Sequence, residues 1–230
     1  MYDKQRHRRL RLLIKKLNKD RKKQNQKIDI LCNDLISAQR NFIKRLNVIS
    51  FVANFYESII GTTDLNDLLC AAVKFIKAEN EDSNVTFFLR QEWESANRSQ
   101  NGNPQIDRKM GTQESFELHI FESDRPIAIE KQFIENCFTQ ELMDNISKSN
   151  KVCTLDDMYA MGLHGNLNEL NKISAVTIPL GILGSSLGFI LVYRSSEKKL
   201  NADEINRISA VISGLSRAII SCRTLSRAAD

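Results

Sequence analysis

The sequence has few histidines and no closely spaced pair of cysteines. It contains three histidines, His7, His119 and His164, and none is spaced to share a metal ion with another histidine or with a cysteine. The five cysteines are scattered and never form a C-x-x-C pair. This pattern argues against a thiolate zinc site and against a disulfide framework. We therefore expect no metal site.

Long apolar runs are also missing. A membrane-spanning helix needs about 20 consecutive apolar residues, and the longest apolar stretch here, residues 178–193, is interrupted by Pro179, by glycines and by serines. The basic N-terminus is not followed by the apolar segment of a secretory signal. These absences predict a cytoplasmic protein.

The sequence lacks the motifs of common enzyme classes. It has no nucleophile elbow, phosphate-binding loop or dinucleotide-binding glycine pattern. Gly181, Gly184 and Gly188 lie between two expected strands, so a hairpin turn accounts for them. Asp156 and Asp157 fall in an expected loop with no base or nucleophile beside them. We expect no catalytic residues and a non-enzymatic protein.

Positive charge is confined to one segment. The chain has a net charge of +5, but residues 1–27 contain twelve Lys and Arg against Asp3 and Asp20, a local charge of +10. The rest of the chain therefore carries a net charge of −5. Residues 4–27 are consistent with a solvated helix face or with the stub that follows a membrane span. They are also consistent with salt-sensitive binding to nucleic acid or to an anionic membrane surface.

A long helix is expected from about residue 10 to residue 60, where proline and glycine are absent. Apolar residues recur there in heptads, interrupted by Arg21, Gln24 and Arg45. Such a seven-residue repeat favours a coiled coil over a one-sided surface helix, although one long helix packed on its own domain is the alternative. We predict a parallel homodimer through the seam residues Ile14, Leu17, Ile28, Leu31, Leu35, Phe42 and Ile49.

The remaining residues predict alternating helices and strands. Gly61 ends the first helix, and a second helix covers about residues 65–77. Strands are expected at 85–90, 115–121 and 152–155, a helix at 134–148, a long loop at 91–114, and an irregular segment at 156–172 with a helical turn near Met158. A hairpin of 174–180 and 187–193 and a helix from 201 or 202 complete the chain. This order predicts an α+β fold, an antiparallel sheet flanked by helices.

The most specific stretch is residues 173–220. Its Ile178-Pro179-Leu180, the glycine-containing turn and Leu187-Gly188-Phe189, followed by Asp203-Glu204 at the start of a closing helix, resemble the GAF domain, a ligand-sensing family. The resemblance covers roughly residues 50–226. It implies a basic N-terminal coiled-coil helix (residues 1–49) and a GAF-like domain (residues 50–230).

The resemblance also implies where a ligand and a second copy would lie. A small apolar or planar ligand would fit between the sheet and the middle segment, although a filled core that binds nothing is the alternative. Residues 152–172 would then close over the pocket as a lid, with His164 as its polar contact. The expected pocket residues are Phe116, Leu118, Phe133, Cys137, Phe138, Met143, Cys153, Met158, Met161 and His164. The last helix would add Ile205, Ile212 and Ile219 to the dimer interface.

The marks of specialised GAF subclasses are incomplete. Bilin-binding members attach the chromophore to a cysteine that is usually followed by histidine, whereas Cys153 is followed by Thr154. Cyclic-nucleotide-binding members have a phenylalanine where this chain has Lys199. No motif therefore requires a particular cofactor. The expected function is a dimeric sensor that binds an unidentified ligand or a signalling partner protein; the alternatives are a coiled-coil scaffold with an empty GAF-like domain, and a regulator associated with nucleic acid or a membrane.

Overall fold

The computed structural model describes residues 2–80, 82–91, 115–120, 131–166, 170–182 and 185–229. Most of the loop expected at 91–114 therefore lies outside the described residues. Contacts divide the chain into two compact units, Met1–Ser50 and Phe51–Asp230. The helices and strands are, in chain order, α1 (Tyr2–Ile59), α2 (Leu65–Glu79), β1 (Asn84–Arg90), β2 (Phe116–His119), α3 (Lys131–Cys137), α4 (Gln140–Ser149), β3 (Cys153–Thr154), α5 (Leu155–Ala160), β4 (Ile173–Ile182), β5 (Ser185–Ser195) and α7 (Ala202–Ala229).

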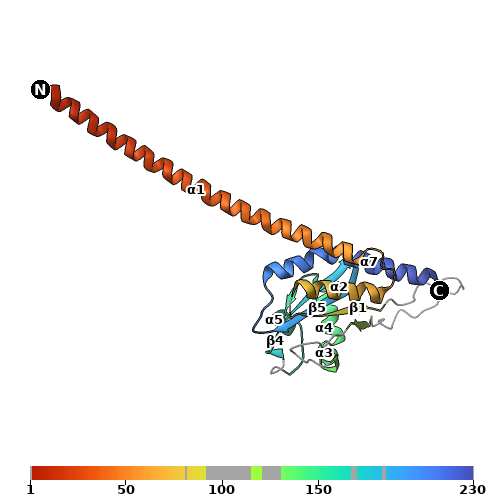
Figure 1. The fold of residues 1–230 in the computed structure, drawn as a ribbon. Helices are drawn as coiled ribbons and strands as arrows, with labels where there is room; N and C mark the ends of the chain where they lie inside the picture. The colour runs from red at the N-terminus through yellow and green to blue at the C-terminus, as the bar shows by residue number, and fades with distance from the viewer. Residues whose placement is uncertain are drawn as a thin grey trace, which may run out of the picture. The chain divides into compact units, whose positions relative to one another are not determined.

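Helix α1 is continuous for 58 residues (Figure 1), as the absence of proline and glycine predicts. It ends where expected, because Gly61 adopts a left-handed conformation (φ 85°) that side chains disfavour. The next helix, α2, begins after Asp64, whose carboxylate accepts a hydrogen bond from the backbone N–H of Asp67 at 3.0 Å.

The described strands of the second unit form one antiparallel sheet in the order β2-β1-β5-β4-β3. Strand β1 is buried along almost its whole length. Phe87 and Leu89 belong to the apolar cluster on one face, and Phe88 belongs to the cluster on the other. This burial on both faces explains why Phe87, Phe88 and Leu89 are apolar in succession instead of alternating with polar residues. The expected α+β fold with a flanked antiparallel sheet is confirmed.

Helices cover both faces of the sheet (Figure 1). The end of α1 together with α2 and α7 covers one face, and α3, α4 and α5 cover the other. We call the first apolar layer the α2–α7 cluster and the second the α3–α5 cluster. The α2–α7 cluster includes Phe51, Phe55, Leu68, Leu69, Ile76, Val85, Phe87, Leu89, Ile178, Ile190, Ile208, Val211, Leu215 and Ile219.

His119 departs from the sequence-based expectation. Its alternation with Phe116 and Leu118 predicts a side chain on a polar, solvated face, but only 16% of the His119 side chain is exposed. The reason is that both faces of the sheet are covered. Burial lowers the pKa of His119, partly countered by the nearby carboxylate of Glu117.

The middle segment contains more helix than the sequence predicts. The single helix expected at 134–148 is two helices, because Thr139 caps a new one: its hydroxyl accepts a hydrogen bond from the N–H of Leu142 at 3.3 Å. The helical turn expected near Met158 is part of α5. A capping box starts α5, with Thr154 and Asp157 bonded reciprocally through side chain and backbone.

The β4–β5 hairpin depends on Gly188. This residue has φ 138°, and a Cβ there would overlap the backbone carbonyl oxygen of Phe88 in β1. Only glycine therefore lets β5 lie this close to β1 at that point. Pro179, paired with Phe189, follows the short stretch of β4 that pairs with β3. Beyond that stretch β4 has no described partner strand on the β3 side, so the missing N–H of Pro179 is tolerated there.

Helix α7 is bound to the end of β5 by a buried ion pair. The guanidinium of Arg194 donates to both carboxylate oxygens of Glu204, at 2.7 and 3.2 Å, and to the carbonyl of Lys199 at 2.7 Å. Glu204 also accepts from the backbone N–H of Asn201 at 2.8 Å, and its own N–H donates to the Asn201 side chain at 2.8 Å. This reciprocal pair is a capping box at the helix start.

Among the described helices, α7 alone is long and apolar enough to cross a membrane by length and composition. Its apolar face is nevertheless used inside the domain. Ile208, Val211, Leu215, Ile219 and Cys222 are each buried in the α2–α7 cluster. The hydropathy of α7 is therefore accounted for by packing against the sheet.

Candidate ligand-binding site and dimer surface

The α3–α5 cluster is where the structure brings the expected pocket residues together. Every one of them except His164 lies in this cluster or packs against it. Strands β1, β4 and β5 supply one wall, and α3, α4, α5 and the chain after α5 supply the other. The buried members are Phe88, Ile134, Cys137, Phe138, Leu142, Met143, Ile146, Cys153, Met158, Leu163, Leu170, Ile173, Ala175, Phe189, Leu191 and Tyr193.

His164 does not reach the cluster. Its side chain is exposed, whereas the preceding Leu163 is buried. The next residue, Gly165, lies so close to the cluster that an added Cβ would be 2.7 Å from the Cys137 sulfur. The chain after α5 therefore covers the cluster with Leu163 and backbone. His164, the expected polar contact of a ligand, therefore lies outside the cluster in this structure.

Stacked aromatic rings fill the space between the sheet and α3. The ring of Phe88 lies 4.8 Å from that of Phe189 and 5.1 Å from that of Phe138, measured between centroids. Phe116 adds a tilted contact at 6.2 Å to Phe189. Each such pair contributes about 0.5–1.5 kcal/mol beyond the burial of its surface. Opening this part of the cluster would therefore be costly.

The cluster contains one small cavity of about 20 Å³ beside α3 and α5. Such a volume has room for about one water molecule, and a cavity with apolar walls stays dry. In this conformation α3, α5 and Leu163 fill most of the space above the sheet, so residues 152–166 cover a nearly filled cluster and no open pocket. That this segment acts as a lid stays a prediction. The cavity is lined by Phe133, Ile134, Cys137, Phe138, Leu155, Met158, Leu163, Leu170, Ile173, Ala175, Leu191 and Tyr193.

Several of these lining residues were missed by the sequence-based reasoning. Ile173 and Ala175 in β4, and Leu191 and Tyr193 in β5, alternate along their strands and so share one face. The apolar runs on either side of the glycine-containing turn predicted the hairpin. They did not reveal which face of the hairpin meets the middle segment, because that depends on the packing of α3 and α5.

Tyr193 lines this cavity, whose surface is apolar, and its buried hydroxyl is unpaired among the described residues. Its residue is 1% exposed, and its hydroxyl has no hydrogen-bond partner within the described part of the chain. Burial raises the pKa of Tyr193 to about 12, so the phenol is neutral and keeps its proton to donate. An unpaired buried hydroxyl costs about 1–3 kcal/mol. A ligand with a hydrogen-bond acceptor placed near Tyr193 would recover that cost.

The two cysteines of the cluster are packed as thiols. Burial raises the pKa of Cys137, which disfavours the reactive thiolate. The Cys153 thiol donates to the carbonyl of Lys151 at 3.4 Å and lies 3.4 Å from the hydroxyl of Ser149. Within the described residues, no group of three histidine, cysteine or acidic residues is placed to hold a metal ion.

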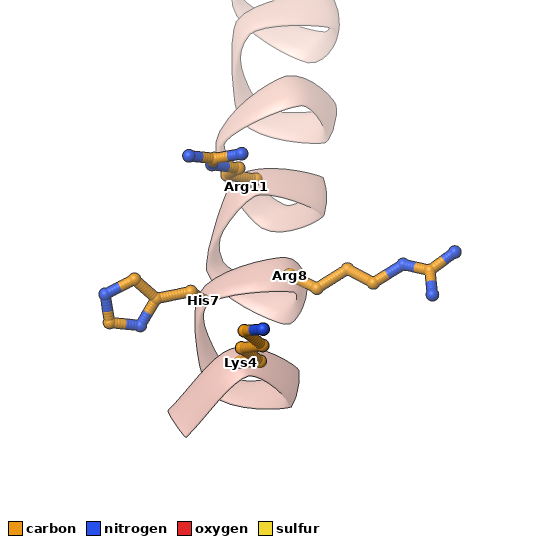
Figure 2. A pocket seen from close by; sticks show the side chains of 4 residues that line it. All are labelled: Lys4, His7, Arg8 and Arg11. Carbon is orange, nitrogen blue, oxygen red and sulfur yellow. The ribbon is translucent and has the colours of Figure 1, made fainter. Parts of the chain in front are cut away.

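Two other hollows are lined by charged residues. An open depression of about 480 Å³ lies beside Asn80, Arg194 and Glu204, but its charged groups are largely paired with one another, Arg194 with Glu204 and Lys198 with Asp82. The second is a surface along the first turns of α1, lined by Lys4, His7, Arg8 and Arg11 (Figure 2).

The seam expected for dimerisation is an exposed apolar stripe within the first unit. Its residues Ile14, Leu17, Ile28, Leu31, Leu35, Phe42 and Ile49 are between 55% and 69% exposed. Large apolar side chains in such a regular array are typical of a surface that another helix covers.

The contribution expected from α7 needs correction. Ile219 is fully buried in the α2–α7 cluster of its own domain and offers nothing to a second copy. Ile205 and Ile212 are half-buried against the same cluster. The apolar residues spaced three and four apart on the central face of α7 therefore pack in the core of their own domain.

Comparison with known proteins supports the fold assignment. No protein-family model matches the chain, and no curated protein matches it. Among solved structures, the GAF domain of a phosphoenolpyruvate-protein phosphotransferase from Coxiella burnetii is 12% identical and matches with a TM-score of 0.52, covering 79% of this chain and 98% of that one. At this identity the likeness establishes the fold alone: the chain has a GAF-like fold.

Two further solved structures are similar at lower scores. The GAF domain of a phosphoenolpyruvate-protein phosphotransferase from Acinetobacter is 14% identical, with a TM-score of 0.49 over 76% of this chain and 94% of that one. A Synechocystis GAF domain in its photoproduct state is 16% identical, with a TM-score of 0.48 over 73% of this chain and 100% of that one.

Proposed function

We propose that this chain is a non-enzymatic, homodimeric sensor. Its GAF-like domain responds to a small, mainly apolar ligand or to a partner protein, and α1 passes the response to a second copy. The observation that carries the proposal is the exposed seam of α1, in a chain whose other unit has the fold of GAF domains. A regulatory role fits this combination, because a long paired helix links the state of one domain to the other copy.

Burial of the exposed seam side chains would stabilise a dimer. Full burial of one leucine, isoleucine or phenylalanine side chain contributes about 1.5–3 kcal/mol. A parallel pairing buries each seam residue against its equivalent in the second copy. The polar residues Arg21 and Gln24 occupy two successive seam positions. Polar residues in a seam commonly fix the register and the number of helices in a coiled coil.

Light scattering on the full chain tests the dimer. At micromolar concentration we expect twice the chain mass of 26.3 kDa. Leu31→Asp with Leu35→Asp should give a monomer, because each change places a charge in the seam. The matched control is Asn33→Asp with Ser37→Asp, which adds the same charge at exposed positions on the outward face, away from the seam. A monomer mass for the unmodified chain would refute the dimer.

The ligand would enter the α3–α5 cluster at the small cavity. Because that cavity holds only about 20 Å³, uptake requires α3, α5 or the residues after α5 to move outward. The apolar lining favours an apolar ligand, and the unpaired hydroxyl of Tyr193 favours one with a single acceptor group. This outward movement is the change that the domain would transmit.

Native mass spectrometry of the purified full chain tests ligand binding. We expect a bound species whose retention falls in Tyr193→Phe, since this change removes only the hydroxyl. Tyr56→Phe, a change on the other side of the sheet, is the control and should retain it. Hydrogen exchange should be faster in residues 152–166 than in β4 and β5, because the covering segment must open.

The alternative is a coiled-coil scaffold whose GAF-like domain is an empty dimerisation body. The filled state of the α3–α5 cluster favours this alternative. It takes first place if no bound species is found and residues 152–166 exchange as slowly as the β4–β5 hairpin. Both proposals keep the dimer, so light scattering tests them together and the ligand experiments separate them.

A further inference from the structure

Leu12 has surroundings in α1 that the dimer does not explain. In the heptad repeat that places Ile14 in the seam, Leu12 lies on the outward face. Leu12 is 61% exposed. Residues three and four positions away are its neighbours on a helix surface. All four are basic: Arg8, Arg9, Lys15 and Lys16. An exposed leucine is thus enclosed by cations at the surface of α1.

The cations continue along the same face of the helix. Steps of three or four residues join Lys4, Arg8, Arg11, Lys15, Lys19 and Lys22 into one exposed stripe. At about 1.5 Å per residue, the stripe is about 27 Å long. Figure 2 shows that Arg8, a member of the stripe, and the neighbouring His7 project to opposite sides of the helix, so the residues at its start do not enclose a pocket. The stripe therefore fits an extended anionic surface better than a small anion.

We propose that the outward face of residues 4–23 binds an anionic lipid surface. The basic side chains would bind the lipid headgroups, and Leu12 with the adjacent exposed Leu13 would enter the boundary between headgroups and acyl chains. The seam residues Ile14 and Leu17 remain available to the second copy, so membrane binding and pairing use different faces.

Leu12 favours lipid over nucleic acid. Phosphate groups of DNA or RNA would satisfy the cations, but they would leave a leucine enclosed by cations against a polar, charged backbone. A lipid surface satisfies both kinds of side chain at once. The lipid assignment therefore predicts that binding depends on Leu12 as well as on charge.

Vesicle flotation with the full chain tests the proposal. The chain should bind vesicles that contain about 30% phosphatidylserine in phosphatidylcholine, and bind pure phosphatidylcholine vesicles far more weakly. Each cation near an anionic surface contributes roughly fivefold to partitioning, so Lys15→Gln with Lys19→Gln should weaken binding about 25-fold. The control, Lys148→Gln with Lys151→Gln, removes the same charge from an exposed part of the GAF-like domain and should bind normally.

Leu12→Ser separates the lipid surface from nucleic acid. Partial burial of a leucine predicts about a tenfold loss of vesicle binding, whereas Gln26→Ser, on the same outward face, should have no effect. Light scattering should show that both variants keep the oligomeric state of the unmodified chain. Equal binding to anionic and neutral vesicles would overturn the proposal. The proposal would also be overturned if Leu12→Ser left vesicle binding unchanged and the unmodified chain bound duplex DNA as tightly as it binds anionic vesicles.

Discussion

Glu204 of α7 forms an ion pair with Arg194 of β5, and replacing Glu204 tests how much this ion pair stabilises the domain. Its side chain is 14% exposed and that of its partner Arg194 is 8% exposed, and they form two hydrogen bonds. Glu204→Gln keeps the shape but removes the charge. Arg194 would then be nearly buried beside a neutral amide, with its Nε also lacking a partner in the described part of the structure.

The expected cost is about 3 kcal/mol. Breaking a buried pair by removing one charge costs about 3–5 kcal/mol, and the remaining exposure of Glu204 places this pair at the lower end. The capping box with Asn201 is retained in part, because glutamine can still accept from the Asn201 N–H. Urea unfolding followed by circular dichroism should show the midpoint lowered by about 1 M.

The effect should also depend on pH. Burial alone would raise the pKa of Glu204, but the Asn201 backbone N–H and the Arg194 guanidinium outweigh it and hold the pKa below its ordinary value of 4.5. A carboxylate with a lowered folded-state pKa stabilises the fold above its ordinary pKa, and this contribution is lost as the pH falls through the lowered value. The difference between Glu204→Gln and the unmodified chain should therefore be full at pH 7 and shrink progressively below pH 4.5.

Glu197→Gln is the matched control, since Glu197 is an exposed glutamate in the same connection. It should change the free energy of unfolding by less than about 0.5 kcal/mol. The reasoning fails if Glu204→Gln destabilises no more than this control. It also fails if the difference persists unchanged on acidification, because the ion pair would then not be its source.

Two glycines give further predictions. Gly188→Ala should prevent native folding, measured by the loss of a cooperative unfolding transition, because a Cβ there overlaps the backbone of β1; a soluble variant with unchanged stability would contradict the close approach. Gly214→Ala should destabilise the domain because its Cβ overlaps the Tyr56 ring, although alanine is intrinsically better in a helix by about 1 kcal/mol. Adding Tyr56→Ala should remove that clash, so that Gly214→Ala becomes neutral or stabilising in this background; an equal loss in both backgrounds would contradict the contact.

Local signals were sufficient for most of the secondary structure. Gly61 ends α1 because a left-handed residue stops a helix whatever surrounds it. Two apolar, strand-forming runs on either side of a glycine-containing turn predicted β4 and β5. The break at Thr139 was equally local, and a threonine followed by Glu141 and an apolar residue was its signal. It was missed because the apolar spacing continued across the break.

The candidate site was predicted only in part. Apolar residues in a middle segment between strands must be buried, so Phe138, Cys153 and Met158 were expected in one cluster, and they lie in one. Exposure of His164 could not be foreseen, because a loop histidine has no periodicity that fixes its direction. Tyr193 was missed for the opposite reason: its strand position was clear, but a tyrosine on an apolar face gives no sign that its hydroxyl lacks a partner.

The sequence by itself determined the long helix, its apolar seam, the confinement of basic charge to residues 1–27 and the β4–β5 hairpin, because each is given by the pattern of residues a few positions apart. The tertiary structure alone decided that Ile219 faces its own core, that His119 is covered and that the space above the sheet is nearly full. These outcomes depend on how closely elements distant in the chain approach one another. Close packing allows a cavity only where the side chains of those elements fail to meet.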